Sequence, residues 1–457
     1  MSYPWVPVNL DGPQGSAILA EMIPRTQRRF QMTTMTCAIA LALTTLASMA
    51  SAEDIRYRSF SASAAIGPPA EHFAGELDRV TGTALGDAGR VHFVALPGIP
   101  AIPAQFGGDI VTAVAAGERG GGFDAAYISG SDLNKTWGFL FNSGFPMGPS
   151  FDEFAGFLFG PVNPGKANDG KTVLDLMQEI ERKRNVVAIP IVGSPEQLSG
   201  YFLDPIGPTS RSPGIGLSGL CEQRWTLRYL TPGEDVLRVA CDDLVHDHRA
   251  RANNLTFIKA VPGGGSLVDA VAAGTIQGFE FATPLDDVSQ LFGGTQTPAT
   301  LGVRYVHVPG WQQQFLLTWM LVNQARWNTL SAARQAIVMT TAKNHVLTSY
   351  ADNLRRQGPA LATILADDGE FKRREDGMVL VRWPTRDLRR LSTATIKFLD
   401  QRSADSSLPA SDRADYARFL SLLRTYVRDN DHYWRERQVD PKLRFPRWTD
   451  ADERTIN

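Results

Sequence analysis

The amino-acid sequence predicts an α/β protein made of layered sheets and helices, with largely parallel pairing of its strands. The first reason is a regular alternation of strand-like and helix-like segments from residue 54 onward. The second is the composition: 43% hydrophobic and 21% charged residues are typical of a folded protein and exclude a disordered chain or a polytopic membrane protein. The third is the length of 457 residues, which at about 150 residues per domain allows two or three domains and a deep cleft between lobes.

The first half of the chain contains the clearest alternation of strands and helices. Short apolar runs predict strands at 55–60, 91–96, 123–128 and 185–190. Apolar residues at helical spacing predict helices at 68–80, 110–116 and 174–183.

The second half is less regular. Residues 203–235 are rich in Pro, Gly and Ser, and we expect them to form an inserted surface excursion. A helix is predicted at 266–273, followed by a strand that ends near residue 281. Ser331 is the expected N-cap of a long helix ending near residue 357, and 385–435 is also expected to be helical.

The charge balance limits the partners that the protein can have. The formal net charge is −2, so the chain has no broad basic field that would hold nucleic acid phosphates. We therefore expect no nucleic-acid partner, and any anion that binds must be held by a local site.

The first 52 residues predict an N-terminal extension followed by a signal peptide. A basic cluster ends at Arg29, no charged residue follows from Gln31 to Ala52, and the apolar core at 37–43 is about two helical turns long. A small-residue Ala-Ser-Ala sequence closes this stretch at 50–52. These are the parts of a cleaved secretory signal, which predicts a periplasmic protein; an uncleaved anchor remains the alternative.

Removal of 1–52 would leave 405 residues (457 minus 52) with two cysteines, Cys221 and Cys241. In an oxidising compartment two remaining cysteines are expected to form a disulfide. The alternative is two buried thiols that never meet.

Sequence motifs exclude several kinds of catalytic chemistry. The segment 160–167 approaches a phosphate-binding loop, but Ala167 stands where a magnesium-binding hydroxyl belongs, and two prolines lack N–H groups. The chain has neither a Gly-x-Ser-x-Gly nucleophile motif nor a His-Glu-x-x-His zinc helix. His246 and His248 flank Asp247, and two nearby histidines without a third ligand of a zinc motif indicate a solvated surface. No motif therefore predicts an enzyme.

Three segments resemble a known family. They are Gly-Thr-Ile-Gln-Gly-Phe-Glu at 274–280, Pro-Gly-Trp at 309–311, and an Asn ahead of Trp-Asn-Thr-Leu at 323–330. In this order they resemble the extracytoplasmic solute-binding proteins of TRAP transporters, of the C4-dicarboxylate-binding and ketoacid-binding types. The segment 185–202 resembles the family's strand and Gln-x-x-Gly-aromatic loop. The resemblance covers roughly residues 55–355 and is strongest over 264–331.

The resemblance implies a two-lobed periplasmic solute-binding protein fold, with a ligand cleft between the lobes and a long spanning helix. In the mature chain we expect the first part of lobe I at 53–175 and most of lobe II, including an insertion at 203–235, at 176–282. The strands that cross between the lobes and the long helix are expected at 283–360, and a C-terminal helical region and tail at 361–457.

The family holds its ligand carboxylate with an arginine, because a planar guanidinium binds a carboxylate through two hydrogen bonds. The best match is Arg238, on what resembles the family's strand before a Gly-Gly loop, with Arg228 as the competitor. The resemblance also assigns Tyr201 and Trp311 to the ligand site. Packing in the lobe interior is the alternative for both side chains.

Ketoacid-binding members also hold a metal ion in the cleft, and the matching residues are Gln197, Glu280, Phe281 and Gln313. Gln197, Glu280 and Phe281 would also contact the ligand, although Glu280 has the alternative of capping loop N–H groups. Here Phe281 replaces a tryptophan and Gln313 replaces a glutamate. The loss of one anionic donor favours sodium, or no metal, over calcium. We expect no required cofactor.

The resemblance therefore implies a binding protein that captures a small organic acid and delivers it to the membrane subunits of a TRAP transporter, with a homodimer as a further possibility. One rival is a binding protein that serves a membrane sensor. Another is a secreted hydrolase, which lacks the required nucleophile and base motif.

Overall fold

The computed structural model describes residues 53–59, 67–96, 102–106, 108–130, 143–162, 171–203, 216–222, 225–228, 232–246, 255–257, 263–292, 297–298, 300–365 and 378–437. The predicted N-terminal extension and signal peptide at 1–52 lie outside these residues, as does the end of the C-terminal tail. Within the described ranges, no helix is both long and apolar enough to cross a membrane.

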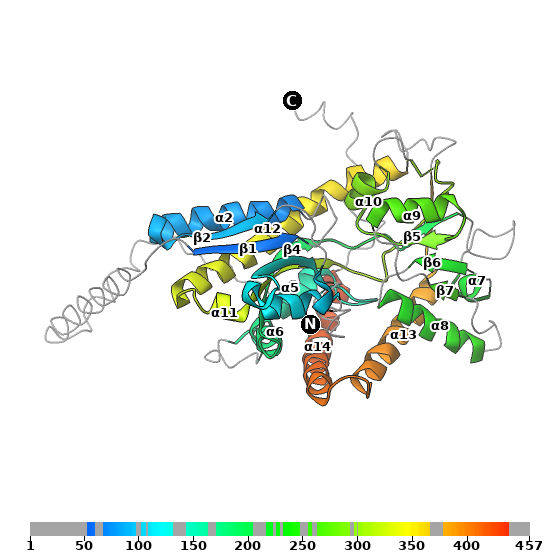
Figure 1. The fold of residues 1–457 in the computed structure, drawn as a ribbon. Helices are drawn as coiled ribbons and strands as arrows, with labels where there is room; N and C mark the ends of the chain where they lie inside the picture. The colour runs from blue at the N-terminus through cyan, green and yellow to red at the C-terminus, as the bar shows by residue number, and fades with distance from the viewer. Residues whose placement is uncertain are drawn as a thin grey trace, which may run out of the picture.

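The strands form two separate sheets, which define a first and a second lobe (Figure 1). The first sheet has the order β2-β1-β3-β10-β4. Its strands are β1 (Glu53–Ser59), β2 (Val91–Leu96), β3 (Ala125–Ser129), β4 (Val186–Ser194) and β10 (Leu316–Asn323). Strands β1, β2 and β3 are parallel, whereas β10 is antiparallel to both β3 and β4. The expected parallel pairing therefore holds for only part of this sheet.

Helices cover both faces of the first sheet, which explains why β4 and β10 are apolar along almost their whole length. One face packs against α2 and the start of α12, and the other against α3, α5, α6 and α14. The bounds of these helices are α2 (Gly67–Leu85), α3 (Ile110–Ala116), α5 (Phe151–Phe159), α6 (Val173–Arg182), α12 (Ala332–Ile364) and α14 (Ala410–Arg437). Short helical turns lie at Asp87–Gly89, Ala104–Phe106, Glu118–Gly120 and α11 (Gln324–Trp327).

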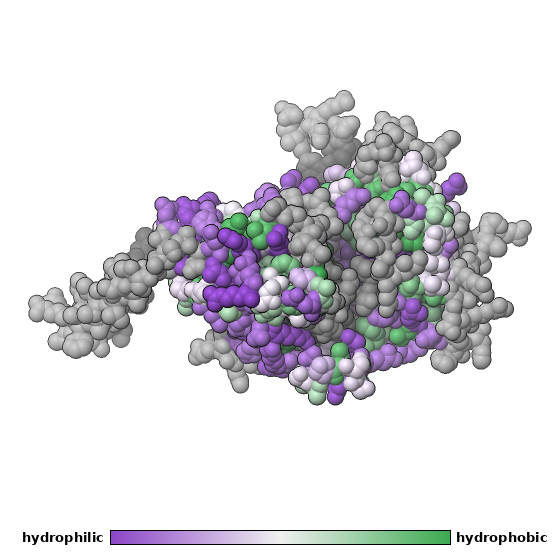
Figure 2. Space-filling view, viewed as in Figure 1, coloured by the Kyte–Doolittle hydropathy of each residue, from purple (hydrophilic) through white to green (hydrophobic). Residues whose placement is uncertain are grey.

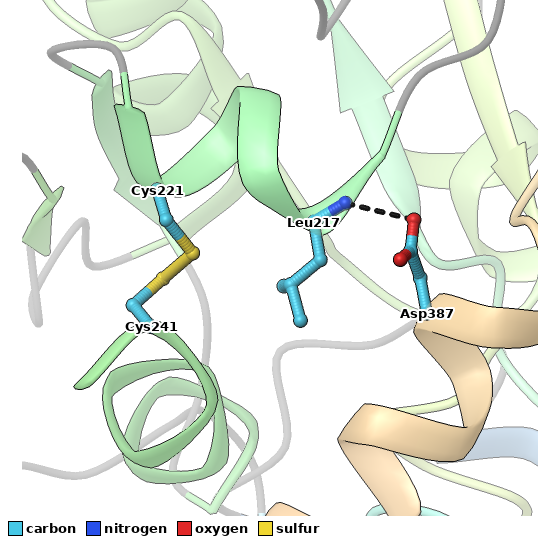
Figure 3. The surroundings of a disulfide bond; sticks show 4 residues. All are labelled: Leu217, Cys221, Cys241 and Asp387. Carbon is cyan, nitrogen blue, oxygen red and sulfur yellow. Dashed lines mark hydrogen bonds between the residues drawn. A yellow bond between two sulfur atoms is a disulfide. The ribbon is translucent and has the colours of Figure 1, made fainter. Parts of the chain in front are cut away.

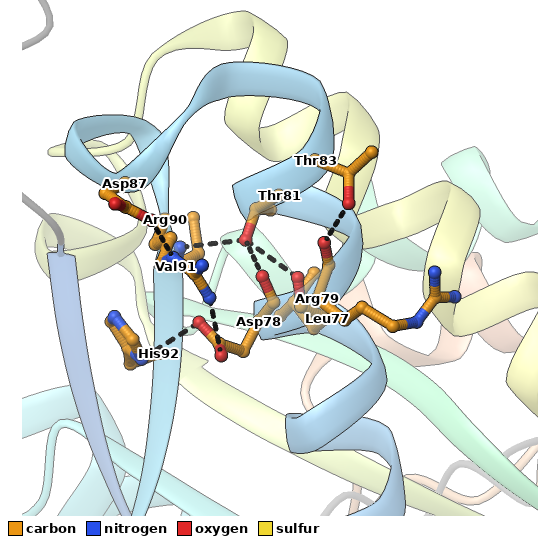
Figure 4. Close-up of polar contacts among 9 residues, drawn as sticks. All are labelled: Leu77, Asp78, Arg79, Thr81, Thr83, Asp87, Arg90, Val91 and His92. Atoms are coloured by element: carbon orange, nitrogen blue, oxygen red, sulfur yellow. Dashed lines mark hydrogen bonds and ion pairs between the residues drawn. The ribbon is translucent and has the colours of Figure 1, made fainter.

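Side chains of α2 and of the connection itself fix the tight turn between α2 and β2 (Figure 4). The Arg90 guanidinium contacts Asp78 of α2 at 2.9 Å and Asp87 of the connection at 2.8 Å. The Thr81 hydroxyl accepts a hydrogen bond from the Val91 backbone N–H at 3.1 Å. The edge of the first lobe is thus held by side chains as well as by strand pairing.

The second sheet has the order β11-β9-β5-β8-β6-β7, and its strands are much shorter. They are β5 (Gly200–Phe202), β6 (Trp225–Arg228), β7 (Leu255–Phe257), β8 (Gly278–Phe279), β9 (Tyr305–Val308) and β11 (Val379–Arg382). The prediction of a surface insertion at 203–235 is wrong for its C-terminal part. Strand β6 lies inside this sheet between β7 and β8, because Trp225 and Leu227 provide apolar side chains for the core.

Two groups of helices cover the second sheet. Helices α7, α8 and α13 share one apolar cluster with β6, and α9 and α10 share another with β5 and β8. Their bounds are α7 (Leu217–Glu222), α8 (Gly233–His246), α9 (Gly263–Ala272), α10 (Pro284–Gln290) and α13 (Thr385–Ser403). On the face in Figure 2, hydrophilic residues cover much of the first lobe, and apolar residues are more visible around α9 and α10.

The chain passes between the lobes several times. Residues 195–199 connect β4 to β5, and residues 309–315 connect β9 to β10. Because β4 belongs to the first sheet, the chain enters the second lobe after Ser194, not near residue 176 as expected.

Helix α12 spans both lobes, as the resemblance implied. Its N-cap is Ser331, whose side chain accepts from the Arg334 N–H. It packs against β4 in the first lobe and against α10 in the second (Figure 1). Helix α13 lies against α8, and α14 returns to the first lobe, where Phe419 meets the Phe157 ring edge-on at 5.3 Å between centroids.

Candidate functional site

Four polar residues that the sequence indicated as candidates for the ligand or metal site lie at one edge of the second sheet. Strands β6, β8 and β9 run in the same direction and β5 runs opposite to them. The carboxyl ends of the first three and the start of β5 therefore share an edge. Arg228 ends β6 and Glu280 follows β8, while Gln197 precedes β5 and Gln313 follows β9. Both connections to the first lobe leave from this edge, so it faces the junction, where open α/β sheets commonly bind ligands.

Arg228 and Glu280 form the charged centre of this edge. The Arg228 Nη1 donates to the Glu280 backbone carbonyl and lies 3.7 Å from its Oε1. Their side chains are only 12% and 2% exposed. The Glu280 backbone N–H donates to the Arg228 carbonyl at 3.0 Å, which holds the two strand ends in register. The guanidinium also lies 5.6 Å from the centroid of the Phe281 ring, within the range of a cation–π contact.

Gln197 and Gln313 lie together where the two connections meet. The Gln197 backbone N–H donates to the Gln313 carbonyl at 3.3 Å, and both side chains are buried. The backbones approach closely here: a Cβ on Gly310 would collide with the Gln197 carbonyl oxygen, so only glycine fits. Gln197 Oε1 is buried and has no hydrogen-bond partner in the described part of the chain. A buried carbonyl oxygen without a partner is unfavourable, so this atom suits a donor or cation supplied from outside.

Tyr201 faces the interior of the second lobe. Its ring stacks on Phe279 at 5.2 Å between centroids, and its hydroxyl donates to Asp287 Oδ2 at 2.5 Å. The other oxygen of Asp287 accepts from the Ala282 N–H at 3.0 Å, just beyond the end of β8. Burial raises the pKa of Tyr201, and likewise raises the pKa of Asp287 well above its usual range. The geometry supports the core alternative for Tyr201, with Asp287 holding the backbone beside Glu280.

Trp311 is also a core residue. Its side chain is fully buried in the apolar cluster that contains Trp225 and Trp383. Its backbone carbonyl accepts from the Met147 N–H at 2.7 Å. The packing alternative therefore fits the geometry of Trp311.

The prediction of a strand around Arg238 is wrong, because this residue lies in the middle of helix α8. Its side chain is 48% exposed and binds Glu234 one turn earlier at 2.9 Å. Its guanidinium carbon lies 4.6 Å from the Phe257 ring centroid. The i,i+4 pair and the aromatic contact account for Arg238 on the helix surface. The competing residue, Arg228, is the arginine that the fold brings to the candidate site.

The possible metal ligands at this edge carry little negative charge and therefore suit a monovalent cation better than a divalent one. Over the described ranges, no group of three or more His, Cys, Asp or Glu residues is arranged to hold a metal. Glu280 is the carboxylate of the predicted set, and the Arg228 guanidinium already lies beside it. Gln197 and Gln313 are neutral donors, which fit a monovalent cation better than calcium.

The carboxyl ends of β1, β2 and β3 lie at the edge where β10 begins. The connections that follow them are 60–66, 97–101 and 131–142, none of which the structure describes.

His307 was not identified from the sequence. It lies on β9 with both ring nitrogens buried and without hydrogen-bond partners among the described residues. Its ring packs 4.5 Å from Phe202 and 5.4 Å from Trp383 between centroids. Burial lowers its pKa from 6.5 to about 3. The signal that was available is its position between two valines in a short apolar run.

A groove of about 410 Å³ lies away from this edge, between α8 and α13. Lys397 on its rim pairs with Asp243 at 2.6 Å, and both side chains are substantially exposed. This groove is better explained as a solvated charged surface than as the ligand site, because exposed ion pairs are common at protein surfaces.

Solved structures share this fold. A TRAP transporter solute-binding protein from Bordetella bronchiseptica, with copurified calcium and picolinate, is 16% identical with a TM-score of 0.60, covering 85% of this chain and 95% of its own. One from Colwellia psychrerythraea, with bound calcium and pyruvate, is 14% identical with a TM-score of 0.59 over 84% and 99% of the two chains. One from Pseudoalteromonas atlantica, with bound sodium and pyruvate, is 15% identical with a TM-score of 0.56 over 85% and 99%.

No protein-family model and no curated protein matches the chain. The solved structures nevertheless show that the chain has the two-lobed fold of the TRAP solute-binding proteins, as the sequence motifs predicted. The similar structures are transport proteins and not enzymes.

Proposed function

We propose that this protein is the periplasmic solute-binding protein of a TRAP transporter, and that it binds a small organic acid at the edge formed by Arg228, Glu280 and Gln197. The observation that carries the proposal is the position of Arg228, a nearly buried guanidinium at the carboxyl end of a strand that faces the lobe junction. The similar structures with bound pyruvate or picolinate support a carboxylate as the ligand.

Arg228 would serve as the anchor of the ligand carboxylate in place of Arg238. Its Nη1 is directed at Glu280, and its Nε is buried without a hydrogen-bond partner among the described residues. A carboxylate offers two acceptor oxygens to such a fork of N–H donors. Glu280 would orient the guanidinium, and the Gln197 side chain would contact the remainder of the ligand. Closure of the first lobe would then bury the anion, and opening at the membrane subunits would release it.

A cation in the site would be held by Gln197, Gln313, Glu280 and the Phe281 carbonyl. Two similar structures contain calcium and one contains sodium beside the organic acid. In this chain the donor set has one carboxylate, and that carboxylate lies beside an arginine. Sodium therefore fits these residues better than calcium, and it would supply positive charge next to the ligand.

The test begins with a thermal-shift screen of pyruvate, picolinate and succinate, because a ligand of the folded state raises stability by mass action. Calorimetry then gives Kd for wild type, Arg228→Gln and the matched control Arg238→Gln. We expect Arg228→Gln to weaken binding by about thirtyfold or more, because loss of one partner of a buried charge pair costs roughly 2–5 kcal/mol. Arg238→Gln should retain wild-type affinity. Binding lost in Arg238→Gln and kept in Arg228→Gln would contradict the assignment.

The cation is tested with the same titration in sodium and in choline at equal ionic strength. The ionic strength must match because screening alone weakens charged contacts. We expect tighter binding in sodium and no change on adding a calcium chelator. Equal Kd values in both salts would mean that Gln197 and Gln313 are hydrogen-bonding groups only, and loss of binding with the chelator would identify a calcium site.

A further inference from the structure

The Cys221–Cys241 disulfide encloses the strand that carries the proposed anchor. It joins the end of α7 to the middle of α8, with 5.4 Å between the Cα atoms and 20 residues of sequence separation (Figure 3). This is the pairing that the two cysteines predicted. Strand β6 lies between the two half-cystines in the chain, and Arg228 is its last residue.

Backbone pairing alone holds β6 weakly. It aligns with β7 at three positions and with β8 at two, and β7 is the edge strand of the sheet. Strands in globular proteins usually have roughly five or six residues, so β6 is a short strand. Its position therefore depends on the side chains Trp225 and Leu227, which pack in the same apolar cluster as Cys221 and α8.

The stability of helix α7 depends on its contacts with other helices. It has six residues, too few for a helix to be stable by itself in water. Its first residue, Leu217, donates its N–H to Asp387 Oδ2 of α13 at 3.0 Å, and its other end carries the disulfide to α8 (Figure 3). The disulfide thus fixes α7 relative to α8, and the two helices together hold β6.

We propose that the Cys221–Cys241 disulfide is a positioning element for Arg228, so that the affinity of the site for a carboxylate depends on the oxidised state of this cysteine pair. This inference rests on the proposed function. Arg228 must lie 3.7 Å from Glu280 Oε1 with its side chain 12% exposed, an arrangement that tolerates little movement of β6. Reduction of the disulfide to two thiols breaks the link between α7 and α8 and allows β6 to move away from β8.

The test compares Kd for a carboxylate from the screen in oxidised wild type, in wild type reduced with excess dithiothreitol, and in the Cys221→Ser/Cys241→Ser double variant. Dithiothreitol supplies two electrons and two protons, and is itself oxidised to a cyclic disulfide. We expect the reduced and the double-variant proteins to bind at least fivefold more weakly than oxidised wild type. A Cys221→Val/Cys241→Ala pair, which keeps the apolar packing, replaces the serine variant if the latter does not fold.

A positioning role is separated from a general structural role by repeating the reduction in two backgrounds. In Arg228→Lys, reduction should change Kd by less than twofold, because the residue that the disulfide positions is already altered. In Arg238→Gln, on the same helix as Cys241, the full effect of reduction should persist. An equal loss of affinity in both backgrounds would overturn the proposal.

The two proposals fail in different ways. Absence of carboxylate binding by oxidised wild type would contradict the proposed function itself. Binding by oxidised wild type, with the same Kd after reduction, would leave the function intact and overturn the role of the disulfide.

Discussion

The two lobes are built differently. In the first lobe, β4 has nine residues and β10 has eight, and nearly all of them are buried between two layers of helices. In the second lobe, no described strand exceeds four residues, and helices and a disulfide hold the strands in place. The proposed binding residues lie at the ends of these short strands. The site therefore lies where strand pairing is short, and packing around the sheet is needed as well to fix its geometry.

This contrast has a physical reason. Long buried strands satisfy their backbone groups within the sheet and gain stability from apolar burial on both faces. Short strands leave their ends free to present polar side chains, at a cost in local stability that neighbouring elements must offset. Substitutions made in one lobe at a time test whether the two lobes differ in this way.

The largest effect is expected in the core of the first lobe. Trp319 of β10 is fully buried in the cluster that includes Phe154 and Phe315. Trp319→Ala should lower the free energy of unfolding by about 3–5 kcal/mol, because it removes apolar contacts and leaves a cavity. The measurement is urea unfolding followed by circular dichroism. The control is Leu354→Ala on α12, where the side chain is 47% exposed and the change should stay within about 0.5 kcal/mol. Equal effects would contradict the packing assigned to the first lobe.

The next effect concerns acid sensitivity of the second lobe. His307 has a folded pKa of about 3 against 6.5 in the unfolded chain. Between these two pH values the unfolded chain binds a proton that the folded protein does not. The free energy of unfolding therefore has its full value above pH 6.5 and decreases as the pH falls towards 3. The decrease is up to about 1.4 kcal/mol per pH unit.

His307→Leu should remove this contribution. Unfolding free energies of both proteins at several pH values provide the check, since the difference between them cancels the other titrating groups. A difference that does not change between pH 7 and pH 4 would exclude His307 as a source of acid sensitivity.

A smaller effect is expected beside the proposed site. Tyr201→Phe removes the hydroxyl that donates to Asp287 and leaves a buried carboxyl oxygen without that donor. The cost should be about 1–3 kcal/mol of unfolding free energy. Tyr433→Phe, at a ring that is 66% exposed, is the matched control and should be neutral. If the two substitutions cost the same, the Tyr201–Asp287 contact does not stabilise the second lobe.

The smallest effect is expected at the start of the spanning helix. Ser331→Ala deletes the side-chain acceptor for the Arg334 N–H and should cost about 1 kcal/mol. Thr340→Ala, at an exposed position inside the same helix, is the control and should change stability by no more than about 0.5 kcal/mol. Thermal unfolding of the two variants in parallel gives the comparison. A loss in Thr340→Ala as large as in Ser331→Ala would argue against the cap.

Local patterns were sufficient for much of the fold. Helix α3 begins and ends where its apolar spacing predicted, and the strands at 55–60, 91–96 and 123–128 are present within a few residues. Ser331 caps α12 as expected. These features depend on neighbours in the sequence, through hydrogen bonds and apolar periodicity over a few residues.

The errors arose where short apolar segments support either type of structure. The run around Arg238 has apolar neighbours on both sides and was expected to be a strand, yet it lies in the 14-residue helix α8. The segment 203–235 has the composition of a loop, but four of its residues form a strand inside the second sheet. Composition over a window does not reveal a four-residue strand, because its stability comes from distant partners.

Sequence patterns were enough to predict the α/β class, the order of the main elements and the capped spanning helix. They also contain the motifs that resemble the TRAP solute-binding proteins. The sequence also supplied the residues Gln197, Glu280, Gln313 and the cysteine pair. The folded structure was needed to show which arginine lies beside Glu280 and that Tyr201 and Trp311 pack in the core. The reason is that helix spacing and caps are local properties of the chain. The approach of Arg228 to Glu280, by contrast, joins residues 52 positions apart through strand pairing, helix packing and a disulfide.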